Sequence, residues 1–80
     1  MMKIKLQYFS QLRDVGGPSS LDVCSGVTVQ ELLDQLFALK PDLHCWDKHL
    51  LIAAGNDWVS RAYVLHENDM ISLMPPVQGG

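Results

Sequence analysis

The sequence predicts a two-layer α+β domain in which a mixed sheet of four to five strands is covered on one face by one main helix. Apolar and polar residues alternate strictly from Lys3 to Tyr8, a period of two that indicates a half-buried strand. From Val29 to Leu39, apolar residues recur at spacings of three and four, which indicates an amphipathic helix. The hydrophobic segment from Met70 to Met74 needs a central strand position. Parallel pairing with the first strand provides it, because the helix supplies the crossover.

The first half of the chain is expected to form a hairpin followed by the helix. The segment from Ser10 to Ser20 contains Gly16-Gly17-Pro18 and is expected to be a wide loop. It leads to a second short strand at Leu21 to Val23, which pairs with the first. Thr28-Val29-Gln30-Glu31 is a capping box that starts the helix at Val29. The helix is expected to end at Lys40, because Pro41 disfavours a helical residue before it.

The second half is expected to add short strands to the sheet. Its expected elements are a helical turn or loop from Asp42 to His49, a fully buried strand from Leu50 to Ala54, a turn at Gly55-Asn56-Asp57, short edge strands at Trp58-Val59 and Tyr63-Val64-Leu65, and a turn at Glu67-Asn68-Asp69. In the last strand, Ile71 and Leu73 share one face. This order of elements is typical of the β-grasp, or ubiquitin-like, fold over residues 1–74, followed by an extended, flexible tail over residues 75–80.

Length and composition narrow the class of protein. Eighty residues form one domain with little room for an enclosed active site, which favours a binding module, a carrier or a subunit. The net charge of −3 argues against a nucleic-acid partner, and 48% apolar residues argue against disorder. We expect no membrane span, since no apolar run approaches the ~20 residues that a span needs, and no signal peptide. Two cysteines are too few for a disulfide scaffold, so we expect a cytoplasmic protein.

The C-terminal sequence Pro75-Pro76-Val77-Gln78-Gly79-Gly80 carries the strongest functional signal. Neither proline can donate a hydrogen bond to a strand neighbour, so the pair ends the last strand and favours a stiff, extended exit. Gly79 and Gly80 lack a Cβ, so this end can enter a channel too narrow for other residues. We interpret the tail as functional rather than as a frayed terminus, because the diglycine follows both a strand and two prolines.

The segment Met70–Gly80 resembles the end of the molybdopterin synthase small subunits, ubiquitin-like sulfur carriers of the MoaD/ThiS superfamily. The resemblance extends upstream to Tyr8–Gly16, Thr28–Leu33 and Ile52–Val59, and so covers nearly the whole chain. Three features differ from the family pattern. The turn before the last strand is Glu67-Asn68-Asp69 instead of Asp-Gly-Asp, Gln78 is bulkier than the usual residue, and the segment from His44 to His49 matches no family pattern.

The resemblance implies a sulfur-carrier chemistry at Gly80. An E1-like adenylyltransferase would use ATP and Mg²⁺ to convert its carboxylate to an acyl-adenylate, and a persulfide sulfur donor would then give a thiocarboxylate. The tail would enter the large subunit of molybdopterin synthase and sulfurate cyclic pyranopterin monophosphate. Gly79 would give access, and Pro75, Pro76, Val77 and Gln78 would set reach and direction. The resemblance implies a sulfur donor without catalysis of its own and without a permanently bound cofactor.

The partner surface is expected to be an exposed apolar area near the start of the tail. Phe9, Leu73 and Met74 are the candidates, each with the alternative of a place in the core.

His44, Cys45 and His49 suggest a metal site, since Cys45 and His49 would share a face if this segment were helical. A structural zinc needs more ligands, with Cys24 as the next candidate, so we expect solvated polar residues and no metal. Cys24 and Cys45 form no C-x-x-C motif, and we expect reduced, buried thiols. Trp46 and Trp58 are interpreted as partial core or surface anchors.

Three other functions remain open. The chain could carry sulfur for thiamine or cysteine synthesis, although the long first loop and the Pro-Pro pair disfavour a thiamine carrier. It could instead be a protein modifier joined to lysines through Gly80, or a non-covalent β-grasp binding module with an inert tail.

Overall fold

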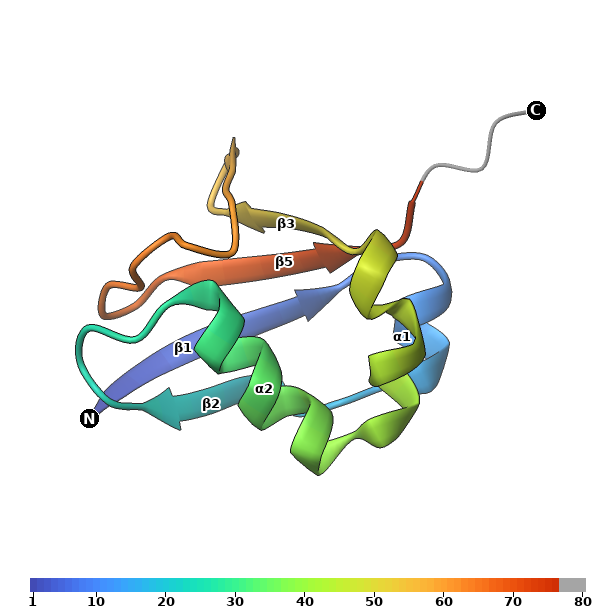
Figure 1. Ribbon diagram of the computed structural model, residues 1–80, viewed down its shortest axis with the longest axis horizontal. Coiled ribbons are helices and arrows are strands. Elements are labelled where there is room, and N and C mark those ends of the chain that lie inside the picture. Colours follow the sequence, from blue (N-terminus) through green and yellow to red (C-terminus); the bar gives the residue numbers. More distant parts are fainter. Residues whose placement is uncertain (77–80) are drawn as a thin grey trace.

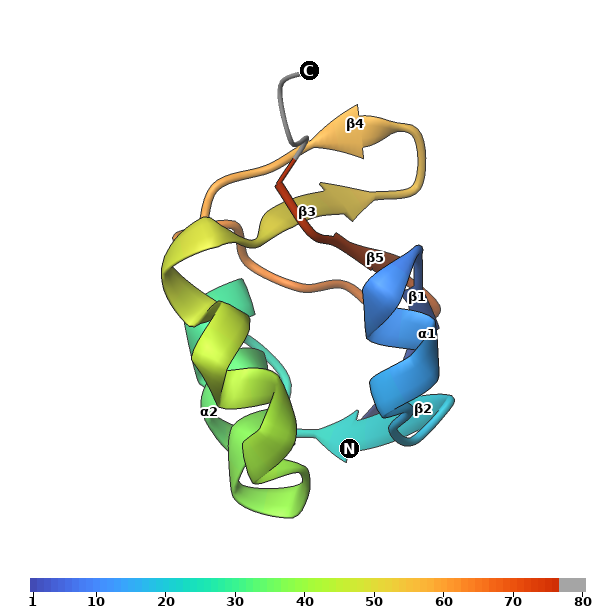
Figure 2. The ribbon, with the colours of Figure 1, turned by 90° about the vertical axis from the view of Figure 1, so that its right-hand side faces the viewer.

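A five-stranded sheet forms one layer of the protein, and helical segments form the other (Figures 1 and 2). The computed structural model describes residues 1–76. In chain order the elements are β1 (Met2–Tyr8), α1 (Gln11–Val15), β2 (Ser20–Val23), α2 (Val29–Leu39), the 3₁₀-helix η1 (Pro41–His49), β3 (Leu51–Ala54), β4 (Asp57–Trp58) and β5 (Met70–Met74). No helix within residues 1–76 is long and apolar enough to cross a membrane.

The strand order β2-β1-β5-β3-β4 places the last strand in the centre of the sheet. β5 pairs in parallel with β1, with Leu6 opposite Ile71, and antiparallel with β3, with Ile52 opposite Leu73. The β2 and β4 pairings are antiparallel, so the sheet is mixed. This arrangement confirms the predicted fold class, including the parallel pairing of the first and last strands across a helical crossover.

The main helix, α2, begins and ends close to where the sequence predicts. The Thr28 amide donates to Glu31 Oε1 at 3.1 Å, and the Glu31 amide donates to Thr28 Oγ1 at 3.3 Å, which completes the capping box. The helix ends at Leu39, one residue before the predicted end. Its buried residues are Val29, Leu32, Leu33 and Leu36, which pack with Ile4, Leu6, Ile71 and Leu73 of the sheet in one core.

The segment from Ser10 to Ser20, predicted as a loop, contains the short helix α1. Leu12 and Val15, three residues apart, lie on one side of α1, and Leu12 is fully buried. α1 contacts η1, so the two close one end of the core (Figure 2). The loop predicted from the glycines and the proline is therefore present only at Gly16 to Pro18, which follow α1.

Two further predictions about the second half are corrected. Tyr63 to Leu65 form no edge strand of the sheet; Val64 makes an isolated bridge to Thr28 at the start of α2. Leu51 in β3 is 39% exposed, so this strand is not buried on both faces. The segment from Asp42 to His49, expected to be a helical turn or a loop, is helical and belongs to η1.

Candidate functional site

The end of β5, from which the tail continues, is fixed by backbone pairing on both sides. Met74 lies opposite Leu51 of β3. On the other side, the Phe9 amide donates to the Leu73 carbonyl oxygen at 3.1 Å, which extends the parallel pairing one residue past the end of β1. Pro75 and Pro76 follow directly and are half-buried. The point at which the chain leaves the sheet is therefore held by the two neighbours of the central strand (Figure 1).

Side-chain alternation separates two faces of the sheet at this point. Ile71 and Leu73 point toward α2 and are buried in the core. Met70, Ser72 and Met74 alternate with them and lie on the face that α2 does not cover, here called the open face. Ser72 is also buried, because the neighbouring strands surround its small side chain.

The open face is apolar along β3, β4 and β5. The strand register places Leu51 beside Met74, and Trp58 beside Ala53. Trp58 is 65% exposed, and Met70 is 38% exposed. We call Leu51, Trp58, Met70 and Met74 the open-face patch. Large side chains of this type rarely gather in the open unless they contact a partner, so the patch, whose Leu51–Met74 end lies at the start of the tail, is a candidate docking surface.

One of the three residues predicted to contact a partner does not lie at the surface. Leu73 is 1% exposed and faces the core, so its side chain cannot contact a partner. Its neighbour Met74 is half-buried on the open face, and Phe9 is half-buried beside the end of β5. Strand alternation explains the difference, because two consecutive strand residues cannot both face outward.

Leu51 was expected in a fully buried strand and is instead exposed, whereas Trp58, interpreted as partial core or a surface anchor, lies at the surface. An apolar run such as Leu50 to Ala54 does not reveal which residues face outward. The available signal was the antiparallel pairing with the last strand, which sets the face of every residue in β3 once the register is known.

The open face also carries charged side chains, on β1 and β2. The alternation in β1 places Lys3 and Lys5 on this face, with Asp22 of β2 opposite Lys3. Both lysines are exposed, although the chain carries a net charge of −3. The open face is thus apolar along β3, β4 and β5 and carries charges of both signs along β1 and β2.

Two tyrosines have a shifted pKa, and neither supplies a base at neutral pH. Burial raises the pKa of Tyr8 to about 12, and its hydroxyl donates to the Pro18 carbonyl oxygen at 2.7 Å. The pKa of Tyr63 is also raised, first by burial and then by its hydrogen bond to Asp69 Oδ2 at 3.2 Å. Both shifts favour the neutral phenol.

The metal hypothesis for His44, Cys45 and His49 loses its geometric basis. It required Cys45 and His49 on one face of an α-helix, but a 3₁₀-helix has three residues per turn, so a spacing of four places them about a third of a turn apart. Among residues 1–76, no group of three or more His, Cys, Asp or Glu side chains is placed to hold a metal ion.

Both thiols are free and exposed, which corrects the expectation that Cys24 and Cys45 would be buried. Cys45 lies on η1, where its thiol donates to the Asp42 carbonyl oxygen at 3.3 Å. Trp46 packs against the core, whereas Trp58 is the surface anchor of the two.

Of the predicted tail residues, Val77, Gln78, Gly79 and Gly80 lie outside the described residues. The site that residues 1–76 define therefore consists of the fixed end of β5, Pro75 and Pro76, and the adjacent open-face patch. Together with the strand order and the single main helix, it defines a ubiquitin-like β-grasp domain with an apolar surface beside its C-terminal segment.

Comparison with known proteins identifies the family. A model described as the ThiS family matches residues 6–80, and the chain belongs to this family. It is 32% identical over 80 residues to the molybdopterin synthase sulfur carrier subunit of Escherichia coli (strain K12), a match that covers 96% of this chain and 99% of that protein. It is 29% identical over 83 residues to the protein of the same name from Chlamydomonas reinhardtii, covering 99% of this chain and 100% of that one.

A solved structure supports the same relationship. The protein-protein complex of subunits 1 and 2 of the molybdopterin-converting factor from Helicobacter pylori contains a chain that is 25% identical to this one, with a TM-score of 0.71. The match covers 99% of this chain and 100% of that chain. The resemblance to the molybdopterin synthase small subunits, first seen in the tail, is thereby confirmed over the full length.

Proposed function

We propose that this chain is the sulfur-carrier subunit of a molybdopterin synthase. The observation that carries the proposal is the sequence Pro75-Pro76-Val77-Gln78-Gly79-Gly80 directly after the central strand, in a chain whose relatives are named molybdopterin synthase sulfur carrier subunits. In the proposed reaction, the Gly80 carboxylate attacks ATP in an Mg²⁺-dependent adenylyltransferase, which releases pyrophosphate and forms an acyl-adenylate. A persulfide sulfur then displaces AMP, and cleavage of the resulting S–S bond by a thiol leaves a thiocarboxylate.

Activation is needed because a carboxylate is a poor electrophile, whereas the acyl-adenylate has a good leaving group. The thiocarboxylate is in turn a soft nucleophile that can attack carbon in cyclic pyranopterin monophosphate. Hydrolysis of the acyl group afterwards returns the Gly80 carboxylate to the carrier, and each molybdopterin dithiolene needs two such transfers.

Acid–base catalysis is assigned to the large subunit rather than to this chain. Within residues 1–76, the tyrosines with shifted pKa both favour the neutral form, and neither is part of the open-face patch. In this proposal the chain acts as a co-substrate and binds no cofactor permanently. A two-subunit complex in the related Helicobacter pylori factor supports a partner of this kind.

The open-face patch is the proposed contact with the large subunit and with the adenylyltransferase. It runs along β3, β4 and β5, and its Leu51–Met74 end lies at the start of the tail, so a partner that covers this end also receives the tail. Trp58→Ser removes a large exposed ring from the patch and is expected to weaken large-subunit binding about tenfold or more. Leu39→Ser is the matched control, because Leu39 is 59% exposed but lies on α2. Equal losses for the two variants would exclude the patch as the contact surface.

The choice of acceptor tests the proposal. The thiocarboxylate form, mixed with the large subunit and cyclic pyranopterin monophosphate, is expected to yield molybdopterin and the unloaded carrier. Deletion of Gly79 and Gly80 should abolish this reaction. Consumption of the thiocarboxylate only by a thiamine or cysteine precursor would assign the chain to those pathways. Conjugates with protein lysines would indicate a modifier, and full function without the diglycine would indicate a non-covalent binding module.

A further inference from the structure

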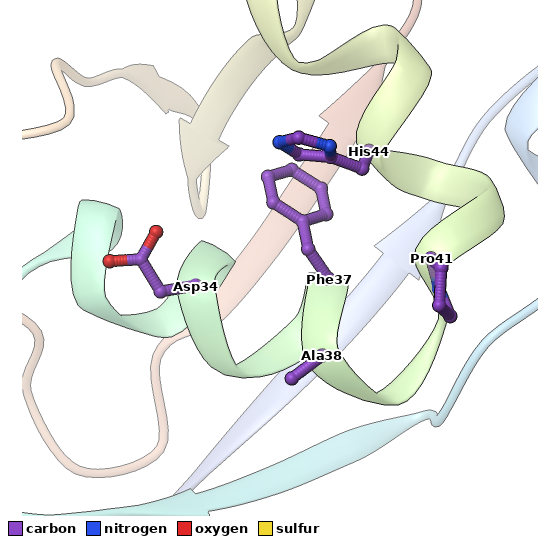
Figure 3. A pocket seen from close by; sticks show the side chains of 5 residues that line it. All are labelled: Asp34, Phe37, Ala38, Pro41 and His44. Atoms are coloured by element: carbon purple, nitrogen blue, oxygen red, sulfur yellow. The ribbon is translucent and has the colours of Figure 1, made fainter.

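The helical layer carries a shallow hollow between α2 and η1, away from the open face of the sheet (Figure 3). Its volume is about 350 Å³. Five residues line it, Asp34, Phe37 and Ala38 from α2 and Pro41 and His44 from η1. We call it the helical-face hollow. None of these residues has a role in the sulfur-carrier proposal.

An aromatic pair forms the floor of the hollow. The rings of Phe37 and His44 lie with their centroids 5.1 Å apart and their planes tilted by 60°. Phe37 is half-buried and packs against the core, which fixes the position of the pair. Figure 3 shows the imidazole of His44 at one edge of the Phe37 ring. The pair thus presents an aromatic surface that is held in place from both helices.

A carboxylate also lines the hollow, one turn of α2 away from the aromatic pair. Asp34 lies one turn before Phe37 on α2 and is exposed. One of its oxygens accepts a hydrogen bond from Gln30 Nε2 at 3.0 Å. Among residues 1–76, no Lys, Arg or His nitrogen lies within 4 Å of the Asp34 carboxylate, so its charge has no cationic partner there. Glu31, three residues earlier, adds a second negative charge to this side of α2.

We propose that the helical-face hollow is a docking site for an arginine side chain that a protein partner presents. A guanidinium group stacks on aromatic rings through its flat face, and its N–H groups pair with a carboxylate in the same plane. Phe37 and His44 provide the rings, and Asp34 provides the carboxylate. An ammonium group fits this combination less well, because it is compact and strongly hydrated.

The position of the hollow makes this contact independent of the tail. It lies on the helical layer, whereas the open-face patch and the end of β5 lie on the sheet (Figures 1 and 2). A partner that covers the open face therefore leaves the hollow accessible. The arginine-bearing partner can bind at the same time as the protein that receives the tail, and this inference does not depend on the sulfur-carrier proposal.

Nuclear magnetic resonance titration of the full chain tests the docking site. The probes are the peptide acetyl-Leu-Arg-Leu-amide and its analogue with citrulline, which has the shape of arginine without its charge. The titrations are done at pH 8. The arginine peptide is expected to shift the amide signals of Phe37, Ala38 and His44 in a saturable way and to bind about tenfold more tightly than the citrulline peptide.

Two substitutions locate the effect. Asp34→Asn keeps the shape of the side chain and the fold, and is expected to lower the affinity for the arginine peptide to that for the citrulline peptide. Asp57→Asn removes an exposed carboxylate on β4 and is expected to change nothing. Deletion of Gly79 and Gly80 is also expected to leave binding unchanged, which separates this test from that of the sulfur carrier.

Three results would overturn the proposal. They are equal affinity for the two peptides, equal losses for Asp34→Asn and Asp57→Asn, and signal changes that centre on Trp58 or are not saturable.

Discussion

The two neighbouring residues Leu73 and Met74 should separate stability from partner binding. Leu73 is 1% exposed on the central strand and packs in the core, whereas Met74 is half-buried on the open face. Leu73→Ala removes three carbon atoms from a site enclosed by β1, β3 and α2. Substitutions of this kind cost about 3–4 kcal/mol where the core cannot collapse around the gap. Met74→Ala removes partly solvated surface and should cost about 1 kcal/mol.

Urea unfolding followed by far-ultraviolet circular dichroism measures both effects. A domain of this size has an m-value of about 1 kcal/mol/M, so Leu73→Ala should lower the unfolding midpoint by about 3 M and Met74→Ala by about 1 M. Since small domains are stable by only about 5–15 kcal/mol, the milder Leu73→Val, expected to cost about 1 kcal/mol, serves if the alanine variant does not fold.

Binding to the large subunit should rank the variants in the opposite order. Met74→Ala removes part of the open-face patch and should weaken binding, whereas Leu73→Val, which folds and keeps the patch intact, should bind as the parent chain does. Equal loss of stability for Leu73→Ala and Met74→Ala would refute the assignment of the two faces of β5. A loss of large-subunit binding seen only with Leu73→Val would also refute this assignment.

Three further predictions concern the stability of the fold. Thr28→Ala removes the capping oxygen that accepts from the Glu31 amide and should cost about 1 kcal/mol in urea unfolding, with Thr28→Ser as the near-neutral control. Gly17→Ala would place a Cβ 2.7 Å from the Tyr8 hydroxyl oxygen, so it should destabilise the fold by about 1–2 kcal/mol, and less in a Tyr8→Phe background, where the hydroxyl is absent. Because burial raises the pKa of Tyr8 to about 12, the folded state favours the neutral phenol. This contribution to stability is complete below pH ~10, the ordinary tyrosine value, and is lost as the pH rises toward 12. Unfolding midpoints that fall equally with pH in the parent and in Tyr8→Phe would contradict it.

The helix α2 and the central strand could be predicted from the sequence because each depends on a strong local signal. The capping box and the apolar stripe set the limits of α2 to within one residue. The hydrophobicity of Met70 to Met74 required a central position, and the parallel pairing with β1 followed from the helix between them.

The segments that the sequence did not predict depend on tertiary contacts. α1 is only five residues long and is held in place by the burial of Leu12, a contact that has no periodic pattern to reveal it. Tyr63 to Leu65 have β-forming residues, but their hydrogen bonds go to the start of α2: the Val29 amide donates to the Tyr63 carbonyl, and the Leu65 amide donates to the Val27 carbonyl.

The candidate site was predictable in part for the same reason. The composition of the tail is a local property, so Pro75 to Gly80 were identified directly from the sequence. The open-face patch depends on the register of β3 and β4 against β5. This register places Leu51 beside Met74, puts Trp58 on the same face and turns Leu73 into the core.

The intact mass of the chain after sulfur loading tests the central claim most directly. The chain is incubated with the adenylyltransferase, ATP, Mg²⁺ and a persulfide sulfur donor, in parallel with a variant that lacks Gly80. The sulfur-carrier account predicts a mass increase equal to the difference between one sulfur and one oxygen atom, located on Gly80 and absent from the variant. An unchanged mass, under conditions that load a known carrier, would contradict it.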